Sequence, residues 1–262
     1  MLIAFDIGNT NIVIGLFKEN KLICKWRLIS DNKKSVDDYA VDIIELFLTC
    51  KIDCLAISGC IIASVVPILT SRILEAVKKF TDEQVGKKTF IIGDDKTKLD
   101  IDIKIKNKNE VGHDRLVNAI AGFKHFGDSL IIVDFGTATT FDIVGKNGEY
   151  LGGVIAPGIN MTLKSLHDMT AQLPKISLKP QKNVIGKSTV EAMNSGVYHG
   201  YIAMIEGMFI KIENELGYKT KKIITGGLCE IFKQPLGTII DHQDPDLTLQ
   251  GLLLVYNNNQ KN

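Results

Sequence analysis

A short acidic phrase with a glycine turn occurs twice in this chain, about half a chain apart. The first copy is Asp6-Ile7-Gly8-Asn9-Thr10, which overlaps the end of the apolar segment at residues 2–7. The second copy is Asp134-Phe135-Gly136-Thr137-Ala138-Thr139, which follows the apolar residues 130–133. Each copy predicts a strand, a carboxylate, a glycine turn and a second strand. A hairpin of this kind can present a carboxylate and bare backbone N–H groups to a metal-bound polyphosphate, and two copies predict two similar halves facing one cleft.

Glycine is expected in both phrases because it lets the backbone approach a phosphate closely and adopt positive φ. One copy alone would more often be an ordinary β-turn closed by an Asx hydrogen bond. The second copy makes phosphate binding the better interpretation of both. A Walker A loop is not predicted: Gly186-Lys187-Ser188 resembles its end, but Gln181 stands at the required earlier glycine and no strand precedes it.

Each of three further glycine turns has two open interpretations. Thr225-Gly226-Gly227 follows a short apolar strand and fits the turn on which an adenosine lies, although most such turns are only turns. Gly152-Gly153 and Pro157-Gly158 bracket a strand end that lines the cleft or simply packs closely against other backbone.

Composition excludes several classes of function. The 262 residues suffice for two modest domains or one large one. The net charge of +1 argues against electrostatically driven binding to nucleic acid or a membrane. No run of about 18 apolar residues is present to predict a membrane-spanning helix. The five cysteines lack a zinc-like spacing with histidine and predict reduced thiols, mostly in the core, of a cytoplasmic protein.

Periodicity predicts the same order of elements, βββαβαβ, in each half. In the first half we expect strands at 2–7, 11–17, 21–30, 54–58 and 89–92 and helices at 36–50 and 67–80. In the second half we expect strands at 130–134, 139–144, 150–155, 222–225 and 238–240, helices at 160–167, 188–216 and 247–256, and a short helix after Gly227. A helix at 114–126 joins the halves, and the polar tail 257–262 is expected to fray.

This pattern defines the predicted fold. Mixed strands and helices indicate the α/β class. The repeated order, with an acidic glycine turn after each first strand, resembles duplicated ribonuclease-H-like domains of the actin-like ATPase and sugar kinase superfamily, which bind ATP in a cleft between two mixed sheets. We predict an N-terminal domain at 1–115 and a C-terminal domain at 116–262.

A candidate catalytic carboxylate precedes the connecting helix. Asp114 and Arg115 fall in its predicted first turn. A carboxylate there can accept a proton from a substrate hydroxyl, and the arginine can hold an anionic substrate with two hydrogen bonds. The alternative is a carboxylate favoured only by the helix dipole, beside a surface arginine.

Together these phrases resemble the type III pantothenate kinase family. The matching segments span nearly the whole chain and are DIGNT (6–10), VGHDRLVNA (111–119), VDFGTATTFD (133–142), GGVIAPG (152–158), GKSTVEAM (186–193) and DPDLTL (244–249).

The resemblance implies a role for individual residues. The residues implied at ATP are Asp6, Ile7, Gly8, Asn9, Thr10, Asn11, Ile12, Val13 and Thr137. The residues implied at pantothenate are Gly112, His113, Asp114, Arg115 and Thr189, with Asp114 also the general base. Asp134 would ligate a monovalent cation, K⁺ or NH₄⁺, and Mg²⁺ would accompany ATP. The family is a homodimer with its substrate pocket at the subunit interface, and glycines on the helix at 188–216 suit close packing there.

The implied reaction is ATP-dependent phosphorylation of pantothenate to 4′-phosphopantothenate, the first step of coenzyme A biosynthesis. The alternative is a non-catalytic, nucleotide-binding regulatory homologue. Two departures favour that alternative: His113 replaces the usual alanine, and Ile105 stands at a usually aromatic position. The retained acidic residues and Thr189 favour the kinase. The expected partners are pantothenate and a second copy of the chain, with no nucleic acid and no membrane.

Overall fold

The computed structural model describes residues 1–260, which form two compact units. Unit 1 comprises Met1–Ile101, Asn107–Ala121 and the described part of Leu247–Asn262. Unit 2 comprises Asp102–Lys106 and Gly122–Asp246. Each unit is described by itself below.

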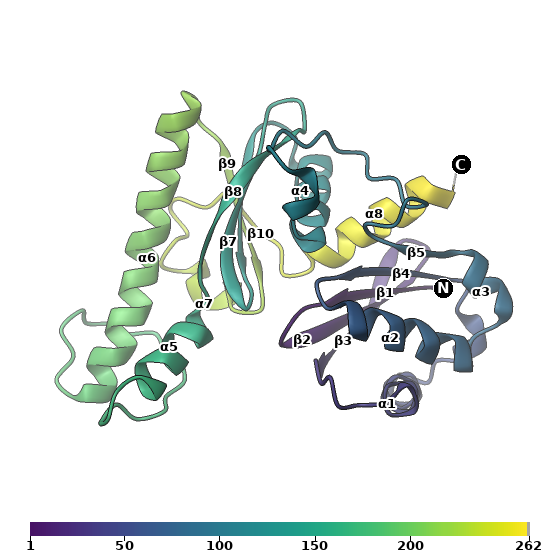
Figure 1. The fold of residues 1–262 in the computed structure, drawn as a ribbon. Helices are drawn as coiled ribbons and strands as arrows, with labels where there is room; N and C mark the ends of the chain where they lie inside the picture. The colour runs from purple at the N-terminus through teal and green to yellow at the C-terminus, as the bar shows by residue number, and fades with distance from the viewer. Residues whose placement is uncertain (261–262) are drawn as a thin grey trace. The chain divides into compact units, whose positions relative to one another are not determined.

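Unit 1 is built on a five-stranded sheet of order β3-β2-β1-β4-β5 (Figure 1). Its strands are β1 Leu2–Ile7, β2 Asn11–Lys18, β3 Lys21–Ile29, β4 Gly59–Ser64 and β5 Thr89–Ile91. Its helices are α1 Val36–Thr49, α2 Pro67–Phe80, α3 Glu83–Lys87 and α8 Leu247–Gln260, and α4 His113–Phe126 begins in this unit. β1 pairs antiparallel with β2 and parallel with β4, so the sheet is mixed.

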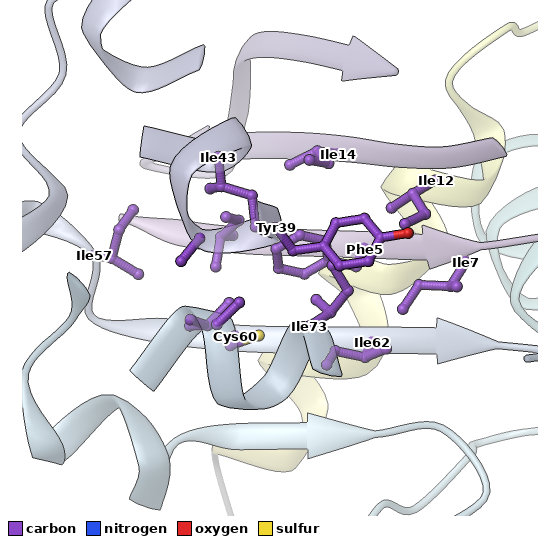
Figure 2. Packing of buried hydrophobic residues seen from close by; sticks show 14 of the residues in the cluster. Phe5, Ile7, Ile12, Ile14, Tyr39, Ile43, Ile57, Cys60, Ile62 and Ile73 are labelled. Carbon is purple, nitrogen blue, oxygen red and sulfur yellow. The ribbon is translucent and has the colours of Figure 1, made fainter. Parts of the chain in front are cut away.

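Successive side chains of β1 point to opposite faces of the sheet, and helices cover both faces. Phe5 and Ile7 belong to the buried cluster that includes residues of α1 and α2, whereas Ala4 belongs to the cluster with α4 and α8. Figure 2 shows Phe5 beside Tyr39 of α1. Burial on both faces holds β1 rigidly, and therefore fixes where the turn after it leaves the sheet.

Unit 2 repeats this arrangement strand for strand, in the order β10-β9-β6-β7-β8. Its strands are β6 Leu130–Phe135, β7 Ala138–Val144, β8 Tyr150–Pro157, β9 Lys221–Gly226 and β10 His242–Gln243. Its helices are α5 Ile159–Asp168, α6 Thr189–Leu216 and α7 Cys229–Lys233. β6 takes the place of β1: Val133 and Phe135 pack with Phe209 of α6, and Gly122 of α4 lies against Ile132 from the other face.

The topology therefore confirms the predicted α/β class and its internal duplication. In both sheets the first strand of the unit is central, pairs antiparallel with the second strand and pairs parallel with the fourth. The two sheets thus have the same strand order.

Two predicted strands are wrong. Residues 54–58 begin with a 3₁₀ turn, Cys54–Ala56, because the Asp53 side chain accepts a hydrogen bond from Leu55 N, and the strand is β4 Gly59–Ser64. Residues 238–240 form turns closed on the Leu236 carbonyl, and the strand that pairs with β9 is β10. In both places a short apolar run predicts a strand, but the observed strand begins a few residues further along the chain.

The predicted fraying of the tail is also wrong for residues 257–260. α8 extends to Gln260 because Asn259 exchanges two hydrogen bonds with the backbone of Lys98, at 2.8 and 2.9 Å. Residues 261–262 lie outside the described residues. The short helix α3 was not predicted.

The remaining expectations concern cysteines, membrane spans and the domain boundary. All five cysteines are free thiols. Cys60 and Cys229 are buried in core clusters, Cys24 and Cys54 pack against one, and Cys50 is exposed, so most lie in or against the core as predicted. Within residues 1–260, no helix combines the length and apolar character needed to cross a membrane. The domain boundary after residue 115 stays a prediction. The compact units differ from it in grouping α8 with the N-terminal strands and Asp102–Lys106 with unit 2.

Candidate active site

The first acidic glycine phrase forms the hairpin between β1 and β2. Residues 8–11, called loop 1 here, are the four that separate the paired Ile7 and Ile12. Gly8 N donates to the Asn11 carbonyl at 2.9 Å and closes the turn. Asp6 is half-buried in β1, with Ile7 between it and the loop, whereas Asn9 and Thr10 are exposed. A carboxylate and an exposed amide-rich turn therefore lie together, as predicted.

The second phrase forms the equivalent hairpin between β6 and β7. Residues 136–138, called loop 2 here, are the three that separate the paired Phe135 and Thr139. Gly136 N donates to the Ala138 carbonyl at 3.1 Å. Asp134 takes the position of Asp6, one residue before the end of the paired segment of its strand. The two predicted phosphate loops are thus equivalent in topology, although loop 2 is one residue shorter.

The reason given for the loop glycines needs correction. Neither Gly8 nor Gly136 has positive φ. A Cβ atom on Gly8 would lie 3.3 Å from the Asn11 carbonyl oxygen, and one on Gly136 would lie 3.4 Å from that of Ala138. These contacts are tight but not prohibitive, so the folded chain alone does not demand glycine there. Because glycine has no side chain, a ligand can approach the backbone of each loop closely.

Two other glycines are required by the packing around loop 2. A Cβ atom on Gly158 would lie 1.9 Å from the Thr137 carbonyl oxygen. Gly226 has φ of +89°, and its Cβ atom would lie 2.3 Å from Asp134 Oδ1. Because Gly158 has no side chain, its backbone packs directly against the Thr137 carbonyl of loop 2. Because Gly226 has none, the Asp134 carboxylate has the room that it occupies. The close-packing interpretation of Pro157-Gly158 is therefore correct, and the packing is against loop 2 itself.

The Asp134 carboxylate meets a basic requirement of the predicted cation site. Hard cations prefer oxygen ligands, and carboxylate oxygens are the strongest of these in proteins. Gly226 makes room for this carboxylate, because a side chain there would overlap Asp134 Oδ1. The carboxylate is the type of ligand that the predicted cation would need.

Asp114 lies in the first turn of α4 in unit 1. Its Oδ1 accepts a hydrogen bond from Arg115 N at 2.9 Å, which fixes the carboxylate against the start of the helix. A Cβ atom on Gly112 would lie 2.5 Å from the same oxygen, so the preceding glycine provides its space. Among residues 1–260, no hydrogen bond reaches Asp114 Oδ2, which leaves that oxygen for a proton from a substrate hydroxyl.

The structure shows how the chain accommodates its two departures from the family pattern. The His113 ring lies over Gly93, whose Cβ atom would be 2.4 Å from two ring atoms and whose φ is +99°. Ile105 lies in unit 2, 3.6 Å from the position of a Cβ on Gly152. A backbone bridge between Ile103 and Tyr150 of β8 holds that segment. Both side chains therefore lie against a glycine.

Thr189 begins α6 and lines an apolar cavity of about 560 Å³ in unit 2. The cavity lies between α5, α6 and Leu173, and its polar groups include the hydroxyls of Thr162 and Tyr201. Thr162 Oγ1 and the Tyr201 hydroxyl are 3.0 Å apart, and the Tyr201 hydroxyl donates to the Pro157 carbonyl. Burial raises the pKa of Tyr201, which keeps this donor protonated. The cavity wall is thereby tied to the segment that supports loop 2.

Unit 1 holds the predicted residues of loop 1 and of the Gly112 to Arg115 segment. Unit 2 holds Asp134, Thr137 and Thr189. The sequence left Gly158 and Gly226 with two open interpretations each, in glycine turns at the ends of two strands. It gave no sign that Tyr201 would lie near the predicted site residues.

Comparisons with known proteins give one answer over most of the chain. A model of the family described as type III pantothenate kinase matches residues 2–211. A type III pantothenate kinase from Persephonella marina (strain DSM 14350 / EX-H1) is 45% identical over 257 residues, covering 98% of this chain and 98% of the relative.

Two solved structures agree on the fold. One is a Campylobacter jejuni protein named for a proposed role as a Baf family transcriptional activator, with TM-score 0.57, 20% identity and coverage of 99% and 100% of the two chains. The other, from Sinorhizobium meliloti, is named as a proposed 2-dehydro-3-deoxygalactonokinase, with TM-score 0.57, 10% identity and coverage of 97% and 95%. At these identities they show the fold alone, and both match this chain over nearly its whole length.

Proposed function

Because the chain belongs to the type III pantothenate kinase family, we propose that it transfers the γ-phosphoryl group of ATP to the primary alcohol of pantothenate. The product is 4′-phosphopantothenate, and the reaction is the first step of coenzyme A biosynthesis. The observation that carries this proposal is the family match over residues 2–211, which includes both phosphate loops and Asp114. Phosphoryl transfer depends mainly on positioning and electrostatics, and glycine loops with a few fixed carboxylates can supply both.

Asp114 is the general base of the proposed reaction. Its Oδ1 is held by Arg115 N, and Oδ2 accepts the proton of the pantothenate hydroxyl as the oxygen attacks the γ-phosphorus. Arg115 follows directly on the same helical turn and holds the anionic end of the substrate by charge-assisted hydrogen bonds. Gly112 and His113 complete this substrate-contacting segment.

The ATP contacts that we propose are given for each unit by itself. In unit 1 they are Asp6, loop 1, Ile12 and Val13, and in unit 2 the proposed contact is Thr137. Exposed backbone N–H groups in a tight turn form a concave site for anions, which suits the ATP phosphates. Mg²⁺ accompanies ATP and reduces the charge on its phosphates.

Asp134 would hold the monovalent cation, K⁺ or NH₄⁺, through the carboxylate for which Gly226 makes room. When bound, this cation supplies positive charge next to loop 2, where the phosphates of ATP are expected. The charge and position of Asp134 are this chain's own contribution to the site.

Pantothenate also contacts Thr189, and the active protein is a homodimer. Support comes from the open face of α6: Gly196 and Gly200 line the cavity beside Thr189, and a Cβ atom on either would meet nothing within 4 Å. An unfilled glycine face lets a second copy of the chain approach the helix closely.

Mixing two inactive variants tests the shared pocket. Asp114→Asn removes the base, and Thr189→Arg blocks the cavity wall. If each site joins these residues from two chains, a heterodimer has one site with both lesions and one with neither. Random exchange then restores about a quarter of the wild-type sites. Exchange verified by mass but without recovered activity would place both residues in one chain's site.

A turnover assay tests the proposed reaction itself. Purified protein in potassium buffer with Mg²⁺ and ATP is expected to form ADP and 4′-phosphopantothenate only when pantothenate is added. Binding of ATP without pantothenate-dependent ADP formation would contradict the proposal and favour the non-catalytic regulatory homologue.

A further inference from the structure

Ser30, the residue directly after β3, makes two hydrogen bonds to loop 1. Its backbone N donates to the Thr10 carbonyl at 3.0 Å, and its Oγ donates to the Gly8 carbonyl at 2.6 Å. Nothing in the sequence pattern had marked this residue. Both hydrogen bonds go to carbonyl groups of the loop, so one residue holds it at two points.

These hydrogen bonds determine the direction of two N–H groups. The peptides that follow Gly8 and Thr10 are trans, so each carbonyl and the next residue's N–H point in opposite directions. Since both carbonyls point toward Ser30, the N–H groups of Asn9 and Asn11 point away from it. Gly8 N is already used within the turn, by the Asn11 carbonyl. Ser30 therefore aims two backbone donors of loop 1 to one side.

Ser30 is itself fixed by the core. The next residue, Asp31, exchanges two hydrogen bonds of 3.0 Å with the hydroxyl of Tyr39: its N donates to that hydroxyl, and its carbonyl accepts from it. Tyr39 is fully buried in α1. Figure 2 shows the Tyr39 hydroxyl at the end of the core cluster where Ile7 and Ile12 lie, and these residues flank loop 1. The fixed orientation of loop 1 thus originates in the core of unit 1.

Loop 2 has no such arrangement at the equivalent position. Asn11 pairs with Ile29, directly before Ser30, and Ala138 pairs with Pro157, directly before Gly158. Gly158 supports loop 2 by backbone contact and has no side chain to donate. The Ser30 hydroxyl therefore has no counterpart at the equivalent position of loop 2.

We propose that Ser30 is a positioning residue for ATP: it holds loop 1 so that the N–H groups of Asn9 and Asn11 face the polyphosphate. This inference rests on the proposed function, because it takes loop 1 to be a phosphate loop. A preorganised set of backbone donors binds an anion without first ordering the loop, so loss of the Ser30 hydroxyl weakens ATP binding more than it slows the chemical step.

The test measures the affinity for the non-hydrolysable analogue AMP-PNP with Mg²⁺ by calorimetry, and the kinetics of each variant. Ser30→Ala is expected to raise the Kd for AMP-PNP and the KM for ATP by about fivefold, as the loss of one net hydrogen bond would. The kcat and the KM for pantothenate are expected to change less than twofold. Ser30→Thr keeps the hydroxyl and is expected to restore an affinity within twofold of wild type.

Ser35→Ala is the matched control in the same unit. Ser35 caps α1 and accepts a hydrogen bond from Asp38 N, so its loss lowers stability without touching loop 1. A Ser35→Ala variant that weakens AMP-PNP binding as much as Ser30→Ala would reduce Ser30 to a structural role and overturn the proposal. An unchanged Kd in Ser30→Ala would do the same.

Two further outcomes remain informative. If Ser30→Ala does not fold, Ser30→Cys keeps the size with a weaker donor and is expected to raise the Kd in its place. If wild type binds AMP-PNP but forms no ADP with pantothenate, the proposed function fails while the Ser30 measurement still stands. Absence of AMP-PNP binding by wild type would overturn both.

Discussion

Loops 1 and 2 occupy the same place in two sheets of the same strand order, yet different contacts hold them. Loop 1 is held at two carbonyls by the amide and hydroxyl of Ser30. Loop 2 rests on the bare backbone of Gly158, and Gly226 leaves space for its carboxylate. Duplication has thus preserved topology but not the local means of support. Strand order depends on a whole sheet, whereas one turn can be supported in several ways.

The surroundings of the loops differ as well. Unit 1 carries Asp114, the proposed base, whereas unit 2 carries Asp134 and the cavity lined by Thr189. Under the proposed function, proton transfer belongs to unit 1 and cation binding to unit 2. Substitutions in the two units should then change different kinetic parameters.

The largest expected effect is that of Asp114→Asn in unit 1. An amide cannot accept the substrate proton, and removing a general base typically lowers kcat by about 10²–10⁴-fold. ATP affinity and the melting temperature are expected to stay near wild type, because the Arg115 N–H can still donate to an amide oxygen. Turnover within threefold of wild type would exclude the base role and remove this difference between the units.

Gly158→Ala is expected to have the next largest effect, in unit 2. Its φ of −75° is open to any residue, so the cost comes only from the clash between the new Cβ and the Thr137 carbonyl. Overpacking of this kind typically costs about 1–3 kcal/mol of stability. The melting temperature and ATP affinity should both fall.

Gly207→Ala in α6 is the matched control for this substitution. A Cβ atom at Gly207 would meet nothing within 4 Å, and glycine inside a helix is less stable than alanine by roughly 0.5–1 kcal/mol. It should raise stability slightly. Equal melting temperatures for the two variants would show that loop 2 does not depend on contact with Gly158.

Asp134→Asn is expected to have the smallest of the three effects and to change the response to potassium. An amide oxygen still coordinates a cation, but without the negative charge. The potassium concentration for half-maximal activity should rise about tenfold, which corresponds to about 1.4 kcal/mol of binding free energy. Titration of activity against potassium in both proteins measures this. An unchanged activation curve would contradict the assignment of the cation to unit 2.

Most of the fold could be predicted because its signals are local. Short contiguous apolar runs predicted β1 and β6, and the long helix predicted at 188–216 is α6, Thr189–Leu216. The errors at 54–58 and 238–240 arose where an apolar run is too short to distinguish a strand from a turn. There the pairing partner decides, and that partner is distant in the sequence.

For the candidate site, the sequence by itself determined which chemical groups are present: two carboxylates followed by glycine turns, an Asp-Arg pair at a helix start, and Thr189 at another. Only the tertiary structure decided how these groups are held. Ser30 is 22 residues from Gly8, and the Tyr201 hydroxyl is 44 residues from the Pro157 carbonyl. Hydrogen bonds between residues so far apart leave no periodic trace in the sequence, because they depend on where the packed strands and helices bring the backbone.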